Sequence, residues 1–227
     1  MKIKRKFLLF LVPALLTGCG GSGEVIKTEE VDKEAYDDFF NAKKLLLERN
    51  FQIDINSTYV TAGQSMVSIM SEEFDSGKVR LMHIEDNEPS YNFMDASYNQ
   101  ETDTLSYDWY VRRSNENHEF LGYFIHHEDV VAPDYNEIAY SYFSLIMDIP
   151  FESFSLVGDY YEAKDLTRGA HGEVISISSF KVYFSTTFTS KIIMDGTLEE
   201  GGDTYEFNTT LKFTNFGNVH VELPNIQ

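Results

Sequence analysis

The sequence predicts an α+β fold in which one antiparallel sheet of about 9–11 strands carries two or more helices. Three observations predict it. Most of the chain after residue 50 consists of short segments in which apolar and polar residues alternate, the connections between them have turn composition, and two segments instead carry apolar residues at helical spacing. Short connections indicate antiparallel neighbours, because a parallel pair needs a longer crossover. A β-sandwich with peripheral helices is the alternative arrangement.

The composition is that of a folded, acidic domain. Of the 227 residues, 42% are hydrophobic and 15% are aromatic, which excludes wholesale disorder. The chain has 18 basic and 37 acidic side chains, and its net charge of −19 opposes binding to nucleic acid or anionic headgroups through a basic patch. No internal repeat and no linker divides residues 31–227, so we expect a single domain there.

The first residues have the organisation of a secretory signal. A basic segment, residues 1–6, precedes an apolar run, residues 7–16, that is too short for a bilayer core of about 30 Å. The tetrapeptide Leu16-Thr17-Gly18-Cys19 follows and resembles the lipobox of bacterial lipoproteins, an aliphatic residue and two small residues before a cysteine. The resemblance implies that residues 1–18 are removed and that the Cys19 thiol receives a diacylglyceryl group. The alternative is an ordinary secreted protein with an incidental cysteine near its cleavage site.

Cys19 is the only cysteine, which excludes an internal disulfide framework. The resemblance makes it a lipid attachment site, and the glycine-rich and polar residues 19–30 then form a flexible tether. Removal of residues 1–18 takes away four basic side chains and no acidic one, which brings the net charge to −23. We therefore expect an acidic domain that is lipid-anchored on the extracytoplasmic face of the cell membrane.

Two segments are expected to be helical. Residues 31–49 carry apolar side chains at helical spacing and end before Asn50. Residues 133–149 begin at Pro133, end before Pro150 and carry a wide apolar stripe. A stripe of this width needs an apolar partner, and the concave face of the sheet is the expected one.

The alternating segments predict eleven strands. Alternation is clearest where Leu105, Tyr107, Trp109 and Val111 are separated by polar or less apolar residues. Between residues 172 and 187 the apolar residues change from odd to even positions at Ser178-Ser179, which predicts a β-bulge or bend. The predicted strands cover residues 51–59, 64–71, 78–85, 90–98, 104–113, 118–127, 154–165, 172–187, 191–198, 204–214 and 219–223.

The order of these elements resembles that of one group of bacterial lipoproteins. A helix, a run of hairpins, a mid-chain amphipathic helix and further hairpins are similar to the LolA/LppX-like half-barrel, a strongly curved sheet wrapped over helices. The ending from Phe213 to Pro224, an aromatic strand, a glycine turn and a short strand before proline, resembles the common tail of that group. The resemblance implies helices on the concave face, where members of this group often enclose an apolar cavity for acyl chains.

The aromatic share is the one compositional feature that points to a ligand. The chain has 18 Phe, 14 Tyr and one Trp, and large rings on a curved sheet can line a pocket. The alternative is that these rings fill an antiparallel core, since Phe and Tyr favour strands. Six aromatic residues on apolar strand faces are the candidate ligand-binding residues: Tyr107, Trp109, Phe120, Phe124, Phe207 and Phe213.

No pattern in the sequence predicts an active site or a metal site. His126-His127-Glu128-Asp129 is the only histidine-rich cluster, and we expect it at an exposed strand end. Adjacent strand residues point to opposite faces, so the two imidazoles do not converge on one ion. Paired carboxylates occur throughout this acidic chain, and none is distinguished by its context. We therefore expect no enzymatic activity, no metal and no cofactor.

Two functions agree with these observations. The first is a membrane-anchored lipoprotein that binds or carries a lipid or another hydrophobic ligand. The second is a protein–protein interaction module of the cell envelope, which has no ligand cavity and exposes a sizeable apolar patch. Neither involves nucleic acid. The state of the concave face, hollow or filled, distinguishes the two.

Overall fold

The computed structural model describes residues 29–85, 88–116, 119–131, 149–170, 173–184, 189–200 and 202–226. The helical elements are α1 (Glu29–Phe39), α2 (Ala42–Leu47) and the short 3-10 helix η5 (Phe151–Ser153). The strands are β1 (Asn50–Thr61), β2 (Gln64–Asp75), β3 (Lys78–Glu85), β4 (Glu88–Asn99), β5 (Thr104–Ser114), β6 (Phe120–Val131), β7 (Ser155–Val157), β8 (Tyr160–Ala163), β9 (Leu166–Ala170), β10 (Glu173–Phe184), β11 (Thr189–Glu200) and β12 (Asp203–Thr214).

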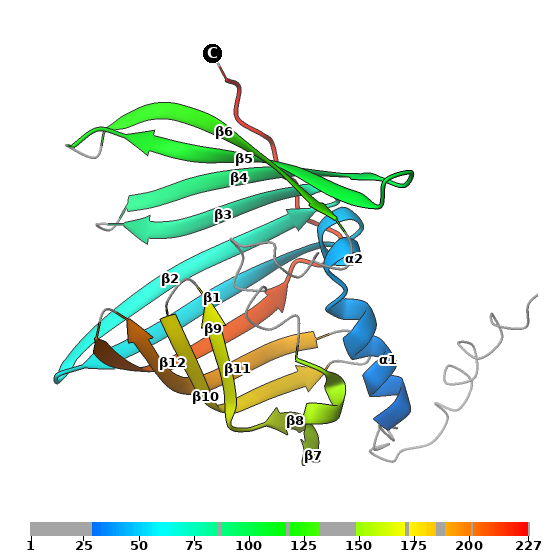
Figure 1. The fold of residues 1–227 in the computed structure, drawn as a ribbon, viewed down its shortest axis with the longest axis vertical. Helices are drawn as coiled ribbons and strands as arrows, with labels where there is room; N and C mark the ends of the chain where they lie inside the picture. Colours follow the sequence, from blue (N-terminus) through cyan, green and yellow to red (C-terminus); the bar gives the residue numbers. More distant parts are fainter. Residues whose placement is uncertain are drawn as a thin grey trace, which may run out of the picture.

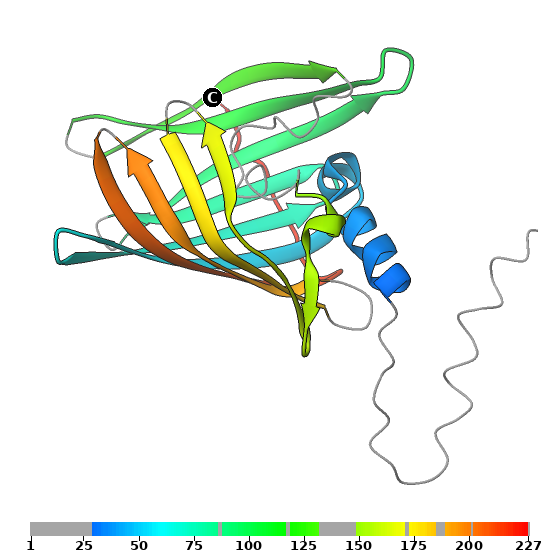
Figure 2. The same cartoon turned by 60° about the horizontal axis from the view of Figure 1, so that its bottom comes forward.

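All these strands belong to one antiparallel, 12-stranded sheet. Its order is β6-β5-β4-β3-β2-β1-β12-β11-β10-β8-β7, and β9 pairs with β10 beside this path. The first strand therefore lies at the centre, where it pairs with β2 on one side and with the last strand on the other. Figure 1 shows α1 and α2 on one face of the sheet, and Figure 2 shows how strongly the sheet curves. The curved antiparallel sheet is confirmed, and the β-sandwich alternative is wrong.

The expected number of strands, about 9–11, is too low because the chain turns where periodicity gives no signal. Residues 154–165 form two strands, since Gly158 takes a φ of +65° between β7 and β8. A further strand, β9, follows Asp165, whose φ is +54°. The predicted bulge is confirmed, because the register of β10 against β11 shifts between Ile177 and Ser179. The predicted strand over residues 219–223 is wrong, as the C-terminal tail forms no ladder.

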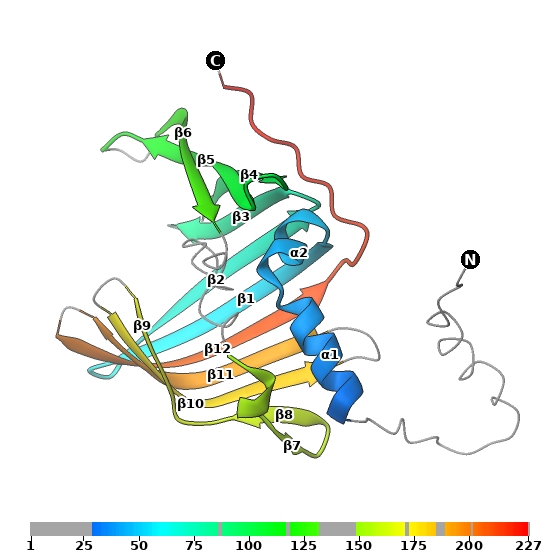
Figure 3. The same cartoon turned by 45° about the vertical axis from the view of Figure 1, so that its right-hand side comes forward.

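The helix expected over residues 31–49 is divided at Asn41. The side chain of Asn41 accepts a hydrogen bond from the Lys44 amide at 3.0 Å, which caps α2 and starts it in a new direction. Most of the second expected helix, residues 133–149, lies outside the described residues. Neither α1 nor α2 is long and apolar enough to cross a bilayer. Figure 3 shows both helices against the same face of the sheet.

Aromatic contacts define which face of the sheet is the inner one. Phe39 of α1 packs against Phe51 of β1 and Phe213 of β12, with ring centroids 5.7 and 5.3 Å apart. Opposed residues of antiparallel strands share a face. The row through Phe51 therefore extends across the second to sixth strands as Phe74, Val79, Met94, Trp109 and His126. We call this side the inner face and the opposite side the outer face.

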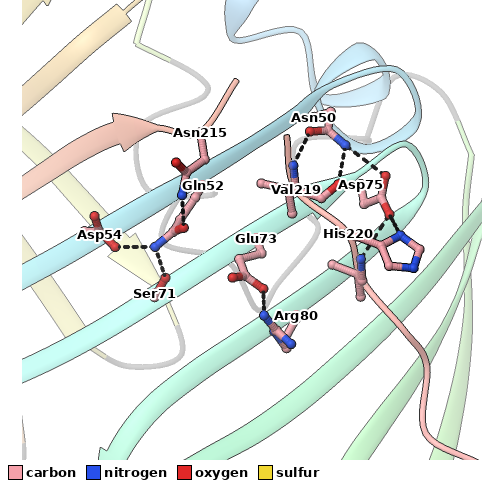
Figure 4. Close-up of polar contacts among 11 residues, drawn as sticks. Asn50, Gln52, Asp54, Ser71, Glu73, Asp75, Arg80, Asn215, Val219 and His220 are labelled. Carbon is pink, nitrogen blue, oxygen red and sulfur yellow. Dashed lines mark hydrogen bonds and ion pairs between the residues drawn. The ribbon is translucent and has the colours of Figure 1, made fainter. Parts of the chain in front are cut away.

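The C-terminal tail is attached to the outer face near the start of β1 (Figure 4). The side chain of Asn50 donates to the Val219 carbonyl and accepts from the Val219 amide, both at 2.8 Å. The Val221 amide donates to Asp75 at 3.0 Å, and Asn50 donates to the same carboxylate at 2.9 Å. The Val221 side chain is fully buried. These contacts explain why the tail forms no ladder, since side chains instead satisfy its backbone.

The hydrogen bond from the Val221 amide, followed by those from Asn50 and His220, holds the pKa of Asp75 below its usual value. A carboxylate with a lowered folded-state pKa contributes stability that is complete above its unfolded pKa of about 3.9 and is lost as the pH falls through the folded value. Asp75→Asn is therefore expected to lower the free energy of unfolding by about 1–2 kcal/mol at pH 7. The difference shrinks below about pH 4. Urea unfolding across this pH range measures it.

Glu222→Gln is the matched control, because Glu222 lies in the same tail and its side chain is 87% exposed. Its substitution is expected to change stability by less than about 0.5 kcal/mol. A loss in Asp75→Asn that persists unchanged at pH 3 would contradict the assignment of the effect to the ionised carboxylate.

Candidate functional site

The inner face of the sheet carries many apolar side chains, whose burial changes with distance from the helices. Near α1 and α2 the strand residues Phe51, Ile53, Phe74 and Val79 are at most 2% exposed. Further along the strands, away from these helices, apolar side chains remain on the inner face but are only partly buried. This second group comprises Tyr59, Met66, Met70, Leu81, Val111, Phe124, Leu198 and Phe207, in which Met66 is 51% and Phe124 is 45% exposed. The described helices therefore cover one end of the inner face.

Polar groups interrupt this apolar face at its centre. Ser57 and Thr209, opposed on β1 and β12, are each 1% exposed and share a hydrogen bond of 2.8 Å. Glu72 of β2 is a carboxylate on the same face and only 3% exposed. Buried polar groups are costly unless they are satisfied, and the mutual hydrogen bond satisfies the hydroxyls of Ser57 and Thr209.

A second polar group lies on the inner face of β5 and β6. The buried Tyr107 hydroxyl donates to Glu128, and Nε2 of His126 lies 2.9 Å from the other oxygen of the same carboxylate. The hydrogen bond from Tyr107, and then the contact with His126, hold the pKa of Glu128 below its usual value although partial burial opposes this shift. Glu128 is therefore an ionised acceptor opposite Tyr107, whose ring centroid lies 6.1 Å from that of Trp109.

The two adjacent histidines point to opposite faces, as expected from the strand periodicity. Nδ1 of His127 lies 2.7 Å from Asp108 and Nε2 lies 3.3 Å from Asp129, both on the outer face. These carboxylates, Asp108 first, raise the pKa of His127. The expectation that the cluster lies at a strand end is wrong, since β6 continues to Val131. Within the described part of the chain, no three His, Cys, Asp or Glu residues are placed to hold a metal ion.

A hollow of about 580 Å³ lies where the β10 bulge meets β9, β11 and β12. Consecutive residues on β10 and β11 line it, so the backbone itself forms part of its wall. Apolar side chains come from Leu166, Ile177 and Phe207. The remaining lining residues are polar, acidic or glycine: Asp165, Thr167, Ser176, Ser178, Asp195, Gly196, Thr197 and Glu206. The hollow thus combines an apolar part with a polar, negatively charged part.

Gly196 permits the close approach of three strands at this hollow. A Cβ atom at this position would lie 2.2 Å from the Ser176 carbonyl oxygen and 2.9 Å from the ring of Phe207. Since real Cβ atoms do not approach backbone oxygens this closely, only glycine allows the bulged β10 to pack here.

The six predicted ligand-binding residues do not form one site. Four of them lie on the inner face: Tyr107, Trp109, Phe124 and Phe207. Phe207 belongs to β12, where it is opposed to Tyr59, and β12 lies on the other side of β1 from β5 and β6. Phe213 is a core residue, 5% exposed, packed under α1. Phe120 lies on the outer face, where it contacts Tyr123 and the Arg112 guanidinium. Strand periodicity alone did not distinguish these environments.

Sequence reasoning also missed several residues that shape the inner face. Glu72, Ser57 and Thr209 are buried, although nothing in their sequence context predicts burial. Gly196 had a usable signal, because a glycine within a strand pattern indicates close backbone approach. The pairing of Tyr107 with Glu128 had no signal, since it depends on the register between β5 and β6.

Comparisons with known proteins find distant structural similarity and no family. No protein-family model matches the chain, and no curated protein matches it. A LolA superfamily protein from Nitrosomonas europaea is 8% identical, covering 86% of this chain and 96% of its own with a TM-score of 0.33. A DUF1329 family protein from Desulfovibrio piger is 8% identical, with 81% and 92% covered and a TM-score of 0.26. A domain described as an outer membrane lipoprotein-sorting protein, from Vibrio parahaemolyticus, is 10% identical, with 86% and 94% covered and a TM-score of 0.27.

Similarities at this level carry no argument about function. The assignment of a role therefore depends on the residues of this chain.

Gly196→Ala is expected to lower the free energy of unfolding by about 3 kcal/mol or more. Its methyl group would collide with the Ser176 carbonyl oxygen, and a backbone atom cannot move away by a change of rotamer. Thr197→Ala, at the next residue of β11, is the control and should cost no more than about 1 kcal/mol. Chemical denaturation of both variants measures the difference. Equal losses would show that the backbones do not approach each other as described.

Proposed function

We propose that this chain is a membrane-anchored lipoprotein that binds a lipid or another apolar ligand on the inner face of its curved sheet. One observation carries the proposal: apolar side chains continue along the inner face beyond the helices and are only partly buried there. Apolar surface in contact with water is unfavourable by about 25 cal/mol per Å², and covering it with an acyl chain recovers that free energy.

The polar groups on the inner face suit a ligand with one polar end. His126 is opposed to Trp109 and contacts Glu128, and Ser57 and Thr209 interrupt the apolar centre. Ligand sites of this kind combine an apolar lining with a few polar groups that set orientation. Among the predicted residues, Tyr107, Trp109, Phe124 and Phe207 therefore stay in the proposal. Phe213 leaves it because it fills the core under α1, and Phe120 leaves it because it lies on the outer face.

The anchor in this proposal is a lipid on Cys19, which lies outside the described residues. Its support is the lipobox-like tetrapeptide that ends at Cys19 and the apolar segment before it.

We also propose that the protein is a binder and not an enzyme. The support is the separation of two inner-face carboxylates: Glu72 on β2 and Glu128 on β6 have three strands of the sheet between them. General acid–base catalysis by a carboxylate pair needs the two groups within a few ångströms of each other.

A second candidate function has its own observation. Phe120, Leu121, Ile125 and Val131 of β6 are 47–58% exposed, and an exposed apolar surface of this kind is typical of a protein-interaction site. An envelope interaction module would use this border of the sheet, and a ligand binder would use the inner face. Substitutions on the two surfaces therefore separate the two functions.

The chain from residue 19 onward, with Cys19→Ser, is expected to bind the neutral fluorescent probe N-phenyl-1-naphthylamine. Met66→Asp should weaken binding by at least about tenfold, because a carboxylate on the inner face is desolvated by the bound probe. Val67→Asp is the matched control: the next residue of β2 is 68% exposed on the outer face, and its substitution should leave the affinity unchanged. Fluorescence titration measures both, and mass spectrometry of organic extracts identifies co-purified lipid.

Two results would contradict this proposal. One is the absence of both probe binding and extractable lipid from a folded protein. The other is equal weakening by Met66→Asp and Val67→Asp, which would place binding outside the inner face.

Expression of the complete chain in a bacterium tests the anchor separately. Cys19→Ala should move the protein from the membrane fraction to the soluble fraction and abolish labelling by radioactive palmitate, since the acyl chains provide the membrane affinity. Ser22→Ala, three residues along the tether, is the control and should change neither readout. Membrane retention and labelling that survive Cys19→Ala would show that the anchor lies elsewhere.

A further inference from the structure

The two borders of the sheet differ in a way that indicates a partner for one of them. At one border, β7 is only three residues long, which leaves little backbone to pair. At the other border, β6 has 12 residues, and no strand in the described part of the chain pairs with the edge of β6 that faces away from β5. Figure 1 shows β6 at the limit of the sheet.

β6 lacks the lysine and proline that often protect an edge strand. Lysine, proline, bulges and inward-pointing charges all prevent another strand from pairing with an edge. The inward-pointing carboxylate of β6, Glu128, is held within its own sheet by the hydrogen bond from Tyr107 and the contact with His126. β6 has no lysine and no proline, and its one register irregularity against β5 lies at its first residues, between Arg113 and Ser114 of the partner strand. Both of its faces expose apolar side chains. Phe124 is 45% exposed on the inner face, and Ile125 is 47% exposed on the outer face.

We propose that β6 pairs antiparallel with β6 of a second copy of this chain, so that two sheets join across a twofold axis at Ile125. Residues opposed in an antiparallel pair must share a face, so the numbers of the two residues must add to an even sum. The register with Ile125 opposite itself meets this condition. It sets Phe124 opposite His126, Tyr123 opposite His127, Gly122 opposite Glu128 and Leu121 opposite Asp129.

This register also avoids repulsion between like charges. Neither carboxylate of β6 faces another carboxylate, and each histidine faces an aromatic ring of the other copy. Another even register, with His126 opposite itself, sets two imidazoles against each other and Phe124 against Glu128, which is less favourable. The chemistry of β6 therefore matches that of its own reversed copy, which is the condition for an isologous interface.

The pairing would give each copy a continuous inner face that extends into its partner. Phe124 and His126 of one copy would lie beside the same residues of the other, next to Tyr107 and Glu128. The inference stands apart from ligand binding, since it rests on the unpaired backbone and the residue pattern of β6. A net charge of −23 per mature chain opposes association, and salt screens this repulsion, so the dimer should strengthen as ionic strength rises.

Sedimentation velocity of the chain from residue 19 onward, with Cys19→Ser, tests the proposal. We expect a monomer–dimer equilibrium with at least about threefold tighter association in 500 mM than in 50 mM sodium chloride. Ile125→Lys would place two ammonium groups opposite each other at the twofold axis, and this repulsion should abolish the dimer. Val67→Lys adds the same charge at an outer-face residue of β2 that is 68% exposed, and it should leave the dimer intact. Circular dichroism confirms that both variants are folded.

Disulfide formation tests the register itself. Cys19 is the only cysteine of the chain, so Ile125→Cys in the Cys19→Ser protein has a single thiol. Opposed Cα atoms of antiparallel strands lie about 4.5–5.5 Å apart, within the range that a disulfide spans. Oxidation should therefore link Ile125→Cys into a dimer and leave Val67→Cys monomeric. A wild-type chain that is monomeric at 100 µM in both salts, or a dimer that survives Ile125→Lys, would overturn the proposal. The first result would leave the β6 border to a different partner.

Discussion

The contact of Phe39 with Phe51 and Phe213 is the interaction on which the rest of the structure depends. It joins α1 to the two central strands, which are also the first and last of the described strands. Once these rings are buried, strand alternation assigns every residue of the sheet to one face. A register slip of a single residue would turn the apolar rows outward, so this packing and the ladder hydrogen bonds stabilise the same arrangement. The inner face, its polar groups and the open border at β6 follow from it.

Much of the architecture could be predicted because the signals are local. Alternation located the six strands of the first half, and the parity change at Ser178-Ser179 located a real bulge. The signals failed where one residue changes the chain direction. Asn41 divides the predicted first helix, and Gly158 divides the strand predicted over residues 154–165. Asp165 precedes β9, which lies where no strand was predicted. Single-residue turns disturb periodicity over too few positions to be detected in a window of ten or more residues.

The candidate site was less predictable than the fold, because aromatic residues with the same periodicity have different neighbours. Phe213 and Phe124 both lie on the inner face, yet α1 covers the first and leaves the second 45% exposed. Phe120 is another phenylalanine at an even position of β6, like Phe124, but it lies on the outer face because the register shifts at Ser114. Buried polar residues such as Glu72 carry no sign of burial in the sequence, since burial depends on elements distant along the chain.

The sequence by itself determined the acidic character, the lipobox-like segment ending at Cys19, the antiparallel strands and their alternation, because these depend on composition and on residues close along the chain. Only the tertiary structure decided which face of the sheet is inner, how far the helices cover it and which strands form its borders. These properties depend on the register between β1 and β12, about 150 residues apart, and on the packing of α1 across both. No local pattern encodes a pairing over that separation.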